Sequence, residues 1–218
     1  MEKIYFDKTT FIWKKKLNFS NNREILLREV YSLMDREPNI QTDAYPYKII
    51  SYSDANSAGE LQIQKEINKI SHIGINYCKE IYNKVGLRYN KINTDAWVNV
   101  IRSKNPIQSC FEHDELLEGV DKYHNHVDVN KKIKSFFPHY TYVYYIQMPD
   151  VMNGEDGALY FKGENDKEYW IRPEEDDLII MAGDMPHAPN NAPNANIDRI
   201  VLAGNVGFDY IKKEKTLF

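Results

Sequence analysis

The chain has 218 residues, a length that fits one compact domain with a substantial buried core. Its apolar fraction of 42%, charged fraction of 28% and net charge of −4 are those of an ordinary globular protein, and they argue against a nucleic-acid partner and against binding to an anionic membrane. Two cysteines, no leader-like apolar run at the start and no stretch long enough to span a membrane predict a cytoplasmic protein.

Residues 1–93 are predicted to form an N-terminal helical support region. Apolar residues recur about every 3.6 positions over 22–35 and over 58–85, which predicts two helices. Short extended pieces are expected within 1–13 and at 47–52. This part of the chain offers no set of residues that suggests catalysis.

Residues 94–218 are predicted to form the functional core, because they are rich in β-branched and aromatic residues. About eight short strands follow one another with no room for helices between them. They are expected at 95–102, 122–127, 139–148, 158–161, 168–171, 178–181, 185–188 and 197–206. The pattern predicts an α+β, mainly β fold: a double-stranded β-helix (jelly roll) with N-terminal supporting helices, in a single compact domain.

One short motif of the predicted core suggests metal binding: His126-Val127-Asp128. On an extended strand, residues two apart point to the same face, so His126 and Asp128 would present an imidazole and a carboxylate together. A second imidazole, from His187 on a later strand, would complete a facial triad of two histidines and one carboxylate. Such a triad holds Fe(II) on three sites and leaves three sites open.

A basic residue near the end of the predicted core adds a second feature. Arg199 shares a strand face with Val201 and Ala203, which are small and apolar. A guanidinium on such a face is costly unless an anion meets it, and its forked geometry suits a carboxylate. Arg199 is therefore predicted to bind the carboxylate of a ligand.

Taken together, residues 95–207 resemble the Fe(II)- and 2-oxoglutarate-dependent oxygenases, in particular the prolyl 4-hydroxylase-like branch. The family pattern is His-x-Asp, an aromatic strand, a glycine-containing strand pair, a distal histidine and a basic residue further on. The matching residues are His126-Val-Asp128, Tyr142-Val-Tyr-Tyr-Ile146, Gly157-Ala-Leu-Tyr-Phe161, His187 and Arg199. The resemblance covers about half of the chain.

The resemblance implies both a reaction and a set of ligands. His126, Asp128 and His187 would ligate Fe(II), and Arg199 would bind the distal carboxylate of the co-substrate 2-oxoglutarate. With O2, such an enzyme hydroxylates a C–H bond and releases succinate and CO2. The substrate implied is a peptidyl residue such as proline, an amino acid or another small metabolite.

The resemblance also implies further residues that contact the co-substrate. A tyrosine of the aromatic strand assists Arg199 in such proteins; strand parity allows Tyr142 or Tyr144, and we favour Tyr142. Asn99 is a further candidate for contacting co-substrate or substrate. Trp97 shares the strand face of Asn99, and structural packing explains its presence as well as a ligand contact would.

Some features depart from the family pattern or leave alternatives open. The segment 173–177 lacks the glycine that commonly precedes the distal-histidine strand, and His124 competes with His126 for one ligand position. A cupin-type metal-dependent enzyme would place a glutamate where Asn130 stands. A non-catalytic jelly-roll binding module would leave Arg199 unexplained.

Overall fold

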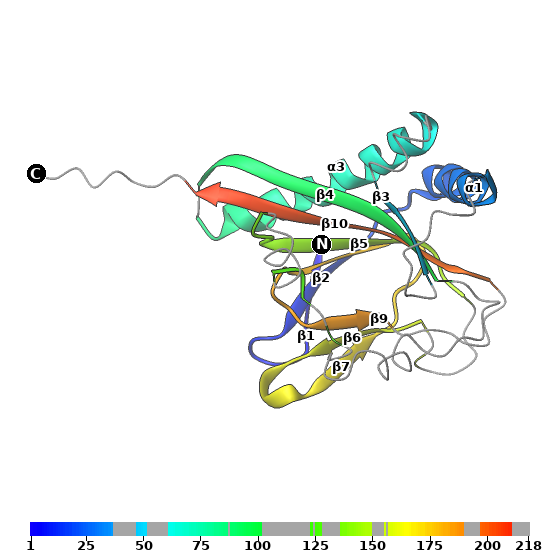
Figure 1. The fold of residues 1–218 in the computed structure, drawn as a ribbon. Helices are drawn as coiled ribbons and strands as arrows, with labels where there is room; N and C mark the ends of the chain where they lie inside the picture. The colour runs from blue at the N-terminus through cyan, green and yellow to red at the C-terminus, as the bar shows by residue number, and fades with distance from the viewer. Residues whose placement is uncertain are drawn as a thin grey trace, which may run out of the picture.

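The computed structural model describes residues 1–36, 47–51, 61–86, 88–101, 123, 125–127, 136–149, 155, 157–189 and 197–210. Within these ranges, two antiparallel sheets lie opposite each other, and two helices cover the outer side of the larger sheet (Figure 1). We call the side of the larger sheet that carries the helices its helical side, and the side that faces the smaller sheet its inner side. Neither described helix combines the length and apolarity that crossing a membrane requires.

The helices of the described residues are α1 (Ser20–Arg36) and α3 (Leu61–Lys84), which confirms both predicted helices. The larger sheet has the order β1 (Glu2–Tyr5), β2 (Phe11–Lys16), β8 (Asp177–Ala182), β5 (Tyr140–Gln147), β10 (Arg199–Tyr210), β4 (Tyr89–Ile101) and β3 (Tyr47–Ser51). The smaller sheet has the order β7 (Glu168–Ile171), β6 (Leu159–Lys162) and β9 (His187–Pro189). Facing antiparallel sheets with helices outside confirm the predicted double-stranded β-helix with supporting helices.

The predicted division of the chain between residues 93 and 94 does not separate two layers. Strand β4 runs across that boundary, and β1, β2 and β3 of the N-terminal part belong to the larger sheet. They extend it at both edges, because β2 pairs with β8 and β3 pairs with β4. The N-terminal part therefore contributes strands as well as supporting helices to one continuous structure.

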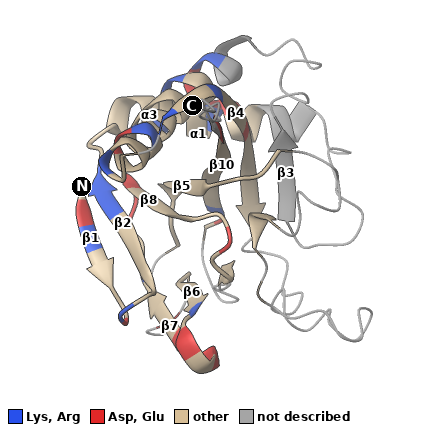
Figure 2. Cartoon of the chain, turned by 90° about the vertical axis from the view of Figure 1, so that its left-hand side faces the viewer, with Lys and Arg blue, Asp and Glu red and all other residues tan. Residues whose placement is uncertain are grey.

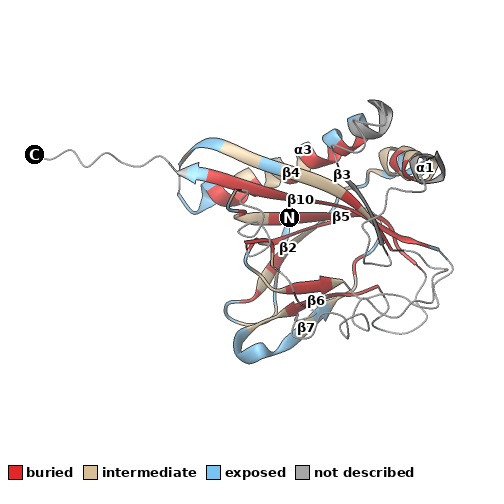
Figure 3. Ribbon diagram, in the orientation of Figure 1, coloured by how far each residue is buried: buried red, intermediate tan, exposed pale blue. Residues whose placement is uncertain are grey.

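Strand alternation divides the core into two clusters, one on each side of the larger sheet, whose central strands are largely buried (Figure 3). On the helical side, Leu26 of α1 and Ile70 of α3 pack with strand residues such as Tyr142. On the inner side, Val143 of β5 packs in one cluster with Phe161 of the smaller sheet. Successive residues of β5 thus face different environments, and the inner cluster surrounds the candidate site.

Close packing between α3 and β10 explains the glycine inside the predicted second helix. A Cβ atom at Gly74 would lie 2.8 Å from the Tyr142 ring, and a Cβ atom at Gly204 would collide with the same ring and its hydroxyl. Glycine at both positions leaves room for the Tyr142 ring between helix and sheet. Gly74 therefore serves the packing of α3.

Two of the three consecutive lysines of β2, the strand next to edge strand β1, form ion pairs; Figure 2 shows the basic residues of β2. Lys14 pairs with Asp177 at 2.8 Å, and Lys16 pairs with Glu174 at 2.8 Å. Both acidic partners belong to β8 or to the turn before it. These lysines therefore fasten β2 to its neighbour, and they do not form a free basic patch.

His139, just before β5, is held in its neutral form by its surroundings. It lies edge-on to the rings of Tyr82 and Phe208, and its Nδ1 accepts a hydrogen bond from the Phe208 backbone N–H at 3.1 Å. That nitrogen consequently carries no proton in the folded protein. Burial lowers the pKa of His139 below its ordinary value of 6.5, although the Phe137 carbonyl and Asp209 act in the opposite direction.

We expect the free energy of unfolding to decrease as the pH falls below about 6.5. The unfolded chain then binds a proton at His139 that the folded chain binds only at a lower pH, so acid favours unfolding. Denaturant titrations at about pH 7.5 and about pH 5.5 would measure the loss. The control is His139→Asn, whose side-chain oxygen can accept from Phe208 without titrating. Equal losses in both proteins would contradict this origin of the pH dependence.

Candidate active site

His126 is placed by a turn of the backbone and not by a strand. The backbone N–H groups of His126 and Val127 both donate to the carbonyl oxygen of Gly183, at 2.9 and 3.2 Å. Consecutive N–H groups of a strand point in opposite directions and cannot share one acceptor, and both residues have helical geometry here. The predicted extended strand over 122–127 is therefore wrong at His126 and Val127.

Two neighbouring residues also bear on metal binding: Asp128, the predicted third ligand, and His124, the alternative to His126. Both lie outside the described residues. Because His126 lies in a helical turn, strand parity no longer supplies the reason for pairing it with Asp128. The assignment of Asp128 as a metal ligand stays a prediction, and so does the competition from His124.

His187 begins β9 and is oriented by a backbone carbonyl. It lies opposite Phe161 of β6 and is 5% exposed. Its Nδ1 lies 2.9 Å from the Met185 carbonyl oxygen, which can only accept, so Nδ1 is the protonated nitrogen. The Nε2 of neutral His187 then carries the lone pair, which is the arrangement that most metal-binding histidines use.

The two histidines meet in the interior. Their rings are nearly parallel, at 14°, with the Nε2 atoms 3.3 Å apart, and His126 also lies against the Trp97 ring at a centroid distance of 5.6 Å. Two nitrogens bound to one ion at roughly 2.1 Å in neighbouring positions lie roughly 3 Å apart, so the distance between the two Nε2 atoms is compatible with a shared metal ion. Without a metal, the same distance suits a hydrogen bond from one ring to the other. The described residues contain no group of three or more His, Cys, Asp or Glu side chains that could hold a metal, and the predicted third ligand, Asp128, is not among them.

Arg199, at the start of β10, lies on the inner side as predicted, since Val201 and Ala203 belong to the inner cluster. Its side chain is buried, and its Cζ lies 5.4 Å from the centre of the Tyr145 ring. Burial raises the pKa of Tyr145 to about 12 although the charge of Arg199 opposes this, so the hydroxyl remains a donor at neutral pH.

This pair has unused capacity to bind an anion. The Nε of Arg199 and the hydroxyl of Tyr145 are buried, and neither makes a hydrogen bond of good geometry within the described part of the chain. The Arg199 side chain nevertheless lies close enough to the Tyr145 hydroxyl to lower its pKa by a hydrogen-bonding contact, so the partnership of the two is already partly formed. A cationic fork beside a neutral hydroxyl donor suits a carboxylate, which accepts from both and compensates the buried charge. The prediction that Arg199 binds a carboxylate is therefore physically reasonable at this position.

Neither tyrosine predicted to assist Arg199, the favoured Tyr142 or the alternative Tyr144, lies on its side of the sheet. Tyr142 and Tyr144 both lie on the helical side, where Tyr142 packs on Gly74 and the Tyr144 hydroxyl donates to Asp176 at 2.5 Å. Neither ring shares the inner side with Arg199. Tyr145 does, because the pairing of β5 with β10 puts it opposite Val201. The sequence predicted that alternate residues of β5 point to opposite sides of the sheet, but it did not reveal which set points to the inner side.

Asn99 of β4 lies on the inner side between the two groups described above. It pairs with Val201, which pairs in turn with Tyr145, and it is two residues from Trp97. Its Oδ1 is buried and has no hydrogen-bond partner among the described residues. The position agrees with a contact to co-substrate or substrate, and that contact stays a prediction.

If Arg199 and Tyr145 bind the carboxylate of the predicted co-substrate 2-oxoglutarate, removing the Tyr145 hydroxyl should weaken its binding about tenfold, because a hydrogen bond to a charged group is lost. Tyr145→Phe tests this by titrating 2-oxoglutarate into the Mn(II)-loaded protein. Tyr142→Phe is the matched control on the helical side of the same strand, and its affinity should be unchanged. Equal effects of the two substitutions, or no effect of either, would argue against the role of Tyr145.

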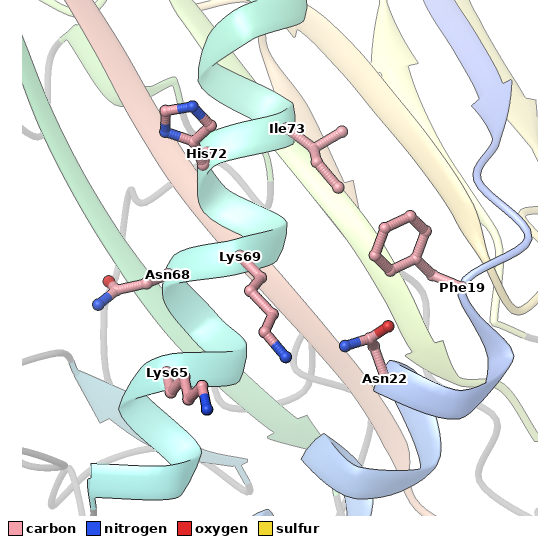
Figure 4. A pocket seen from close by; sticks show the side chains of 7 residues that line it. All are labelled: Phe19, Asn22, Lys65, Asn68, Lys69, His72 and Ile73. Atoms are coloured by element: carbon pink, nitrogen blue, oxygen red, sulfur yellow. The ribbon is translucent and has the colours of Figure 1, made fainter.

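A hollow of the described surface lies on the helical side, between the start of α1 and α3 (Figure 4). Its lining comprises Phe19, Asn22, Lys65, Asn68, Lys69, His72 and Ile73. Asn22 and Lys69 each donate to buried Glu66 at 2.8 Å. Burial is the largest influence on the pKa of Glu66 and raises it, but these bonds and the charges of Lys69 and Lys65 together outweigh burial, so the pKa is lowered. The hollow belongs to the packing of the helices and is separate from the histidine pair.

The described fold and site define a double-stranded β-helix with a buried histidine pair. No protein-family model and no curated protein matches the chain. Among solved structures it is similar to a Trichoplax adhaerens prolyl hydroxylase in complex with a peptide fragment of the hypoxia inducible factor oxygen degradation domain. The identity is 13%, the TM-score is 0.56, and the match covers 91% of this chain and 83% of that one. At this identity the likeness shows the fold alone, and the predicted resemblance is confirmed at that level.

Two further solved structures are similar over most of their length. One is a Pseudomonas putida prolyl-4-hydroxylase, with 14% identity, a TM-score of 0.46 and 92% coverage of both chains. The other is a 2OG-Fe(II) oxygenase family oxidoreductase from Burkholderia pseudomallei, with 10% identity, a TM-score of 0.47, and coverage of 90% of this chain and 84% of that one.

Proposed function

We propose that this chain is an Fe(II)- and 2-oxoglutarate-dependent dioxygenase that hydroxylates a C–H bond of a peptidyl residue, such as proline, or of an amino acid or small metabolite. The observation that carries the proposal is the buried pair of His126 and His187, with Nε2 atoms 3.3 Å apart, inside the same core as Arg199 and Tyr145. This chemistry needs imidazoles that hold the metal and a nearby group that binds the carboxylate of the co-substrate. The histidine pair and Arg199 with Tyr145 would supply these two parts within one double-stranded β-helix.

His126 and His187 would hold the iron together with Asp128 as the third ligand. The Met185 carbonyl keeps the proton of His187 on Nδ1, which leaves Nε2 available for the metal. When bound, Fe(II) and 2-oxoglutarate supply the oxidative chemistry, in which O2 is consumed and succinate and CO2 are released. The contribution of the chain is to place the ligands and keep the site dry.

Arg199 and Tyr145 would bind the distal carboxylate of 2-oxoglutarate, and Asn99 would contact the co-substrate or the substrate. The buried positions of Arg199 and Tyr145 strengthen each charge-assisted hydrogen bond, since little water competes for it. Val201 and Ala203 of the inner cluster would form the apolar surface between the bound carboxylate and the histidines. The co-substrate would thus be oriented along the inner side of β10.

The Trichoplax adhaerens prolyl hydroxylase is in complex with a peptide fragment, and this supports a peptidyl substrate for the present chain. A free amino acid has the same reacting C–H bonds, so it belongs to the same proposal. Succinate production measured against blocked peptides and against amino-acid pools would separate these two sources of substrate.

Anaerobic reconstitution tests the proposed cofactors. Addition of Fe(II) and 2-oxoglutarate to the wild-type protein should produce the weak visible charge-transfer band of a metal-chelated 2-oxo acid. Succinate in place of 2-oxoglutarate is the control, since it lacks the 2-oxo group. Asp128→Ala should lose the band. A wild-type protein without the band, or an unchanged band in Asp128→Ala, would contradict the proposal; metal binding without the band would favour a cupin-type enzyme.

A further inference from the structure

Three polar side chains form a hydrogen-bonded ladder across the inner side of the larger sheet: Thr141 of β5, Asn205 of β10 and Asp95 of β4. The Thr141 hydroxyl donates to the Asn205 side-chain oxygen at 2.8 Å. The backbone N–H and the side-chain amide of Asn205 donate to the two carboxylate oxygens of Asp95, at 3.0 and 3.4 Å. We call these three residues the polar ladder; none of the roles proposed above uses it.

The strand register places the polar ladder beside the histidine pair. In order along β10, the cross-strand rows of the inner side are Thr141–Asn205–Asp95, Val143–Ala203–Trp97 and Tyr145–Val201–Asn99, followed by Arg199. The middle row contains Trp97, whose ring contacts His126. The polar ladder and Arg199 therefore lie on opposite sides of the row that touches the metal site. If 2-oxoglutarate occupies the Arg199 side, the ladder borders the side that remains for the substrate.

The carboxylate of Asp95 is oriented but not neutralised. Burial raises the pKa of Asp95, and the hydrogen bonds from Asn205 act against that effect. No Lys or Arg among the described residues forms an ion pair with it. Each of its oxygens accepts one hydrogen bond from Asn205, and a carboxylate oxygen can accept more.

The remaining members of the ladder are arranged to hold this carboxylate. Thr141 is 0% exposed and Asn205 is 2% exposed, whereas Asp95 is half-buried and stands at the more open end. The Thr141 hydroxyl fixes the amide of Asn205 so that its NH2 group points toward Asp95. A half-buried anion with a fixed geometry is most stable when a cation meets it.

We propose that Asp95 is a specificity-determining residue whose carboxylate receives a guanidinium or ammonium group of the substrate. The inference rests on the proposed function and narrows its substrate class to compounds with a cationic side chain. A charged hydrogen-bonded pair would position the substrate from one side, while the histidine pair lies next to it beyond Trp97.

The competing explanation is that the ladder only fixes the register of β4, β5 and β10. Two substitutions separate the explanations. Asp95→Asn removes the charge and keeps the size, whereas Thr141→Val breaks the ladder at its buried end and keeps the charge. A register role predicts that both lower the melting temperature and that neither alters which ligand is preferred.

The experiment uses the full chain loaded with Mn(II) and 2-oxoglutarate, so that binding is measured without turnover. The calorimetric probes are two matched pairs, L-arginine with L-citrulline and L-lysine with L-norleucine, each free and as the central residue of a blocked tripeptide. The wild-type protein and Thr141→Val should bind a cationic probe at least about tenfold more tightly than its neutral partner. In Asp95→Asn this ratio should fall to about one. The free and blocked forms distinguish an amino-acid substrate from a peptidyl one.

The proposal is overturned if the wild-type protein prefers neither cationic probe, if Asp95→Asn keeps the preference, or if Thr141→Val loses it as Asp95→Asn does. Binding of Mn(II) and 2-oxoglutarate in the same titrations tests the proposed function separately. A protein that binds both but does not discriminate between the probes loses only the role of Asp95. A protein that binds neither loses the proposed function and this inference with it.

Discussion

Replacing His187 by alanine is expected to abolish turnover and to weaken Mn(II) or Fe(II) binding by more than about 100-fold. Loss of a group that merely orients a metal ligand costs roughly 10- to 100-fold in affinity, so loss of a ligand should cost more. The described residues offer no further His, Cys, Asp or Glu that would join His126 in a group of three. Calorimetric titration with Mn(II) measures the affinity directly, independently of any substrate.

The control for this substitution is His72→Ala, which removes an exposed histidine of α3 on the helical side and should leave metal affinity unchanged. His126→Ala should be as damaging as His187→Ala, because the two rings act as one site. Retained binding in His126→Ala together with lost binding in His124→Ala would make His124 the ligand. Unchanged affinity in His187→Ala would contradict the site as a whole.

Replacing Arg199 by alanine should raise the KM for 2-oxoglutarate by about 100-fold, because two charge-assisted hydrogen bonds to its carboxylate are lost. Arg199→Lys keeps the positive charge but loses the fork, and it should recover only part of the affinity. The dissociation constant of 2-oxoglutarate and its KM should rise together, whereas Mn(II) affinity in the absence of 2-oxoglutarate should be unchanged.

Arg28→Ala serves as the control, since Arg28 is an exposed arginine of α1 that pairs only with its neighbour Glu29 among the described residues. Melting temperatures of all variants establish that they fold. If Arg199→Ala binds 2-oxoglutarate as the wild-type protein does, the carboxylate lies elsewhere. If it also loses Mn(II) affinity, Arg199 supports the structure of the metal site and is not a specific anion receptor.

Local periodicity was enough to predict much of the fold. A period near 3.6 predicted both helices, and a period of two put Arg199, Val201 and Ala203 on one side of β10. These features depend on neighbours along the chain, so they are visible in the sequence. The short extended segment after Gly183 was also predicted, and His187 begins the strand found there, whereas its role as a metal ligand stays a prediction.

The features that the sequence did not reveal depend on pairing between distant segments. Which tyrosine faces Arg199 is decided by the alignment of β5 with β10, including an irregularity between Ile200 and Val201. The sequence of β5 does not indicate that alignment, because apolar and aromatic residues occupy both faces of the strand. The geometry of His126 is likewise set by a carbonyl of the β8–β9 turn.

The polar ladder was missed for the same reason. Asp95, Asn205 and Thr141 are far apart along the chain, and each is unremarkable in its own strand. They become a unit only when three strands are laid side by side in register. A cross-strand contact of this kind has no local sequence signal, since it depends on how distant strands pair and in which register.

The turn at Gly183 has a consequence for how the site behaves before any ligand arrives. Its carbonyl binds the backbone of His126, its N–H donates to the His139 carbonyl, and a side chain there would collide with the Pro138 carbonyl. His187 follows only four residues later on the same segment, and the segment of His126 is hydrogen-bonded to this turn, so one anchored turn helps to position both imidazoles. If a metal binds as proposed, less conformational entropy would then be lost on binding, and a disturbance of this single turn would affect both histidines at once.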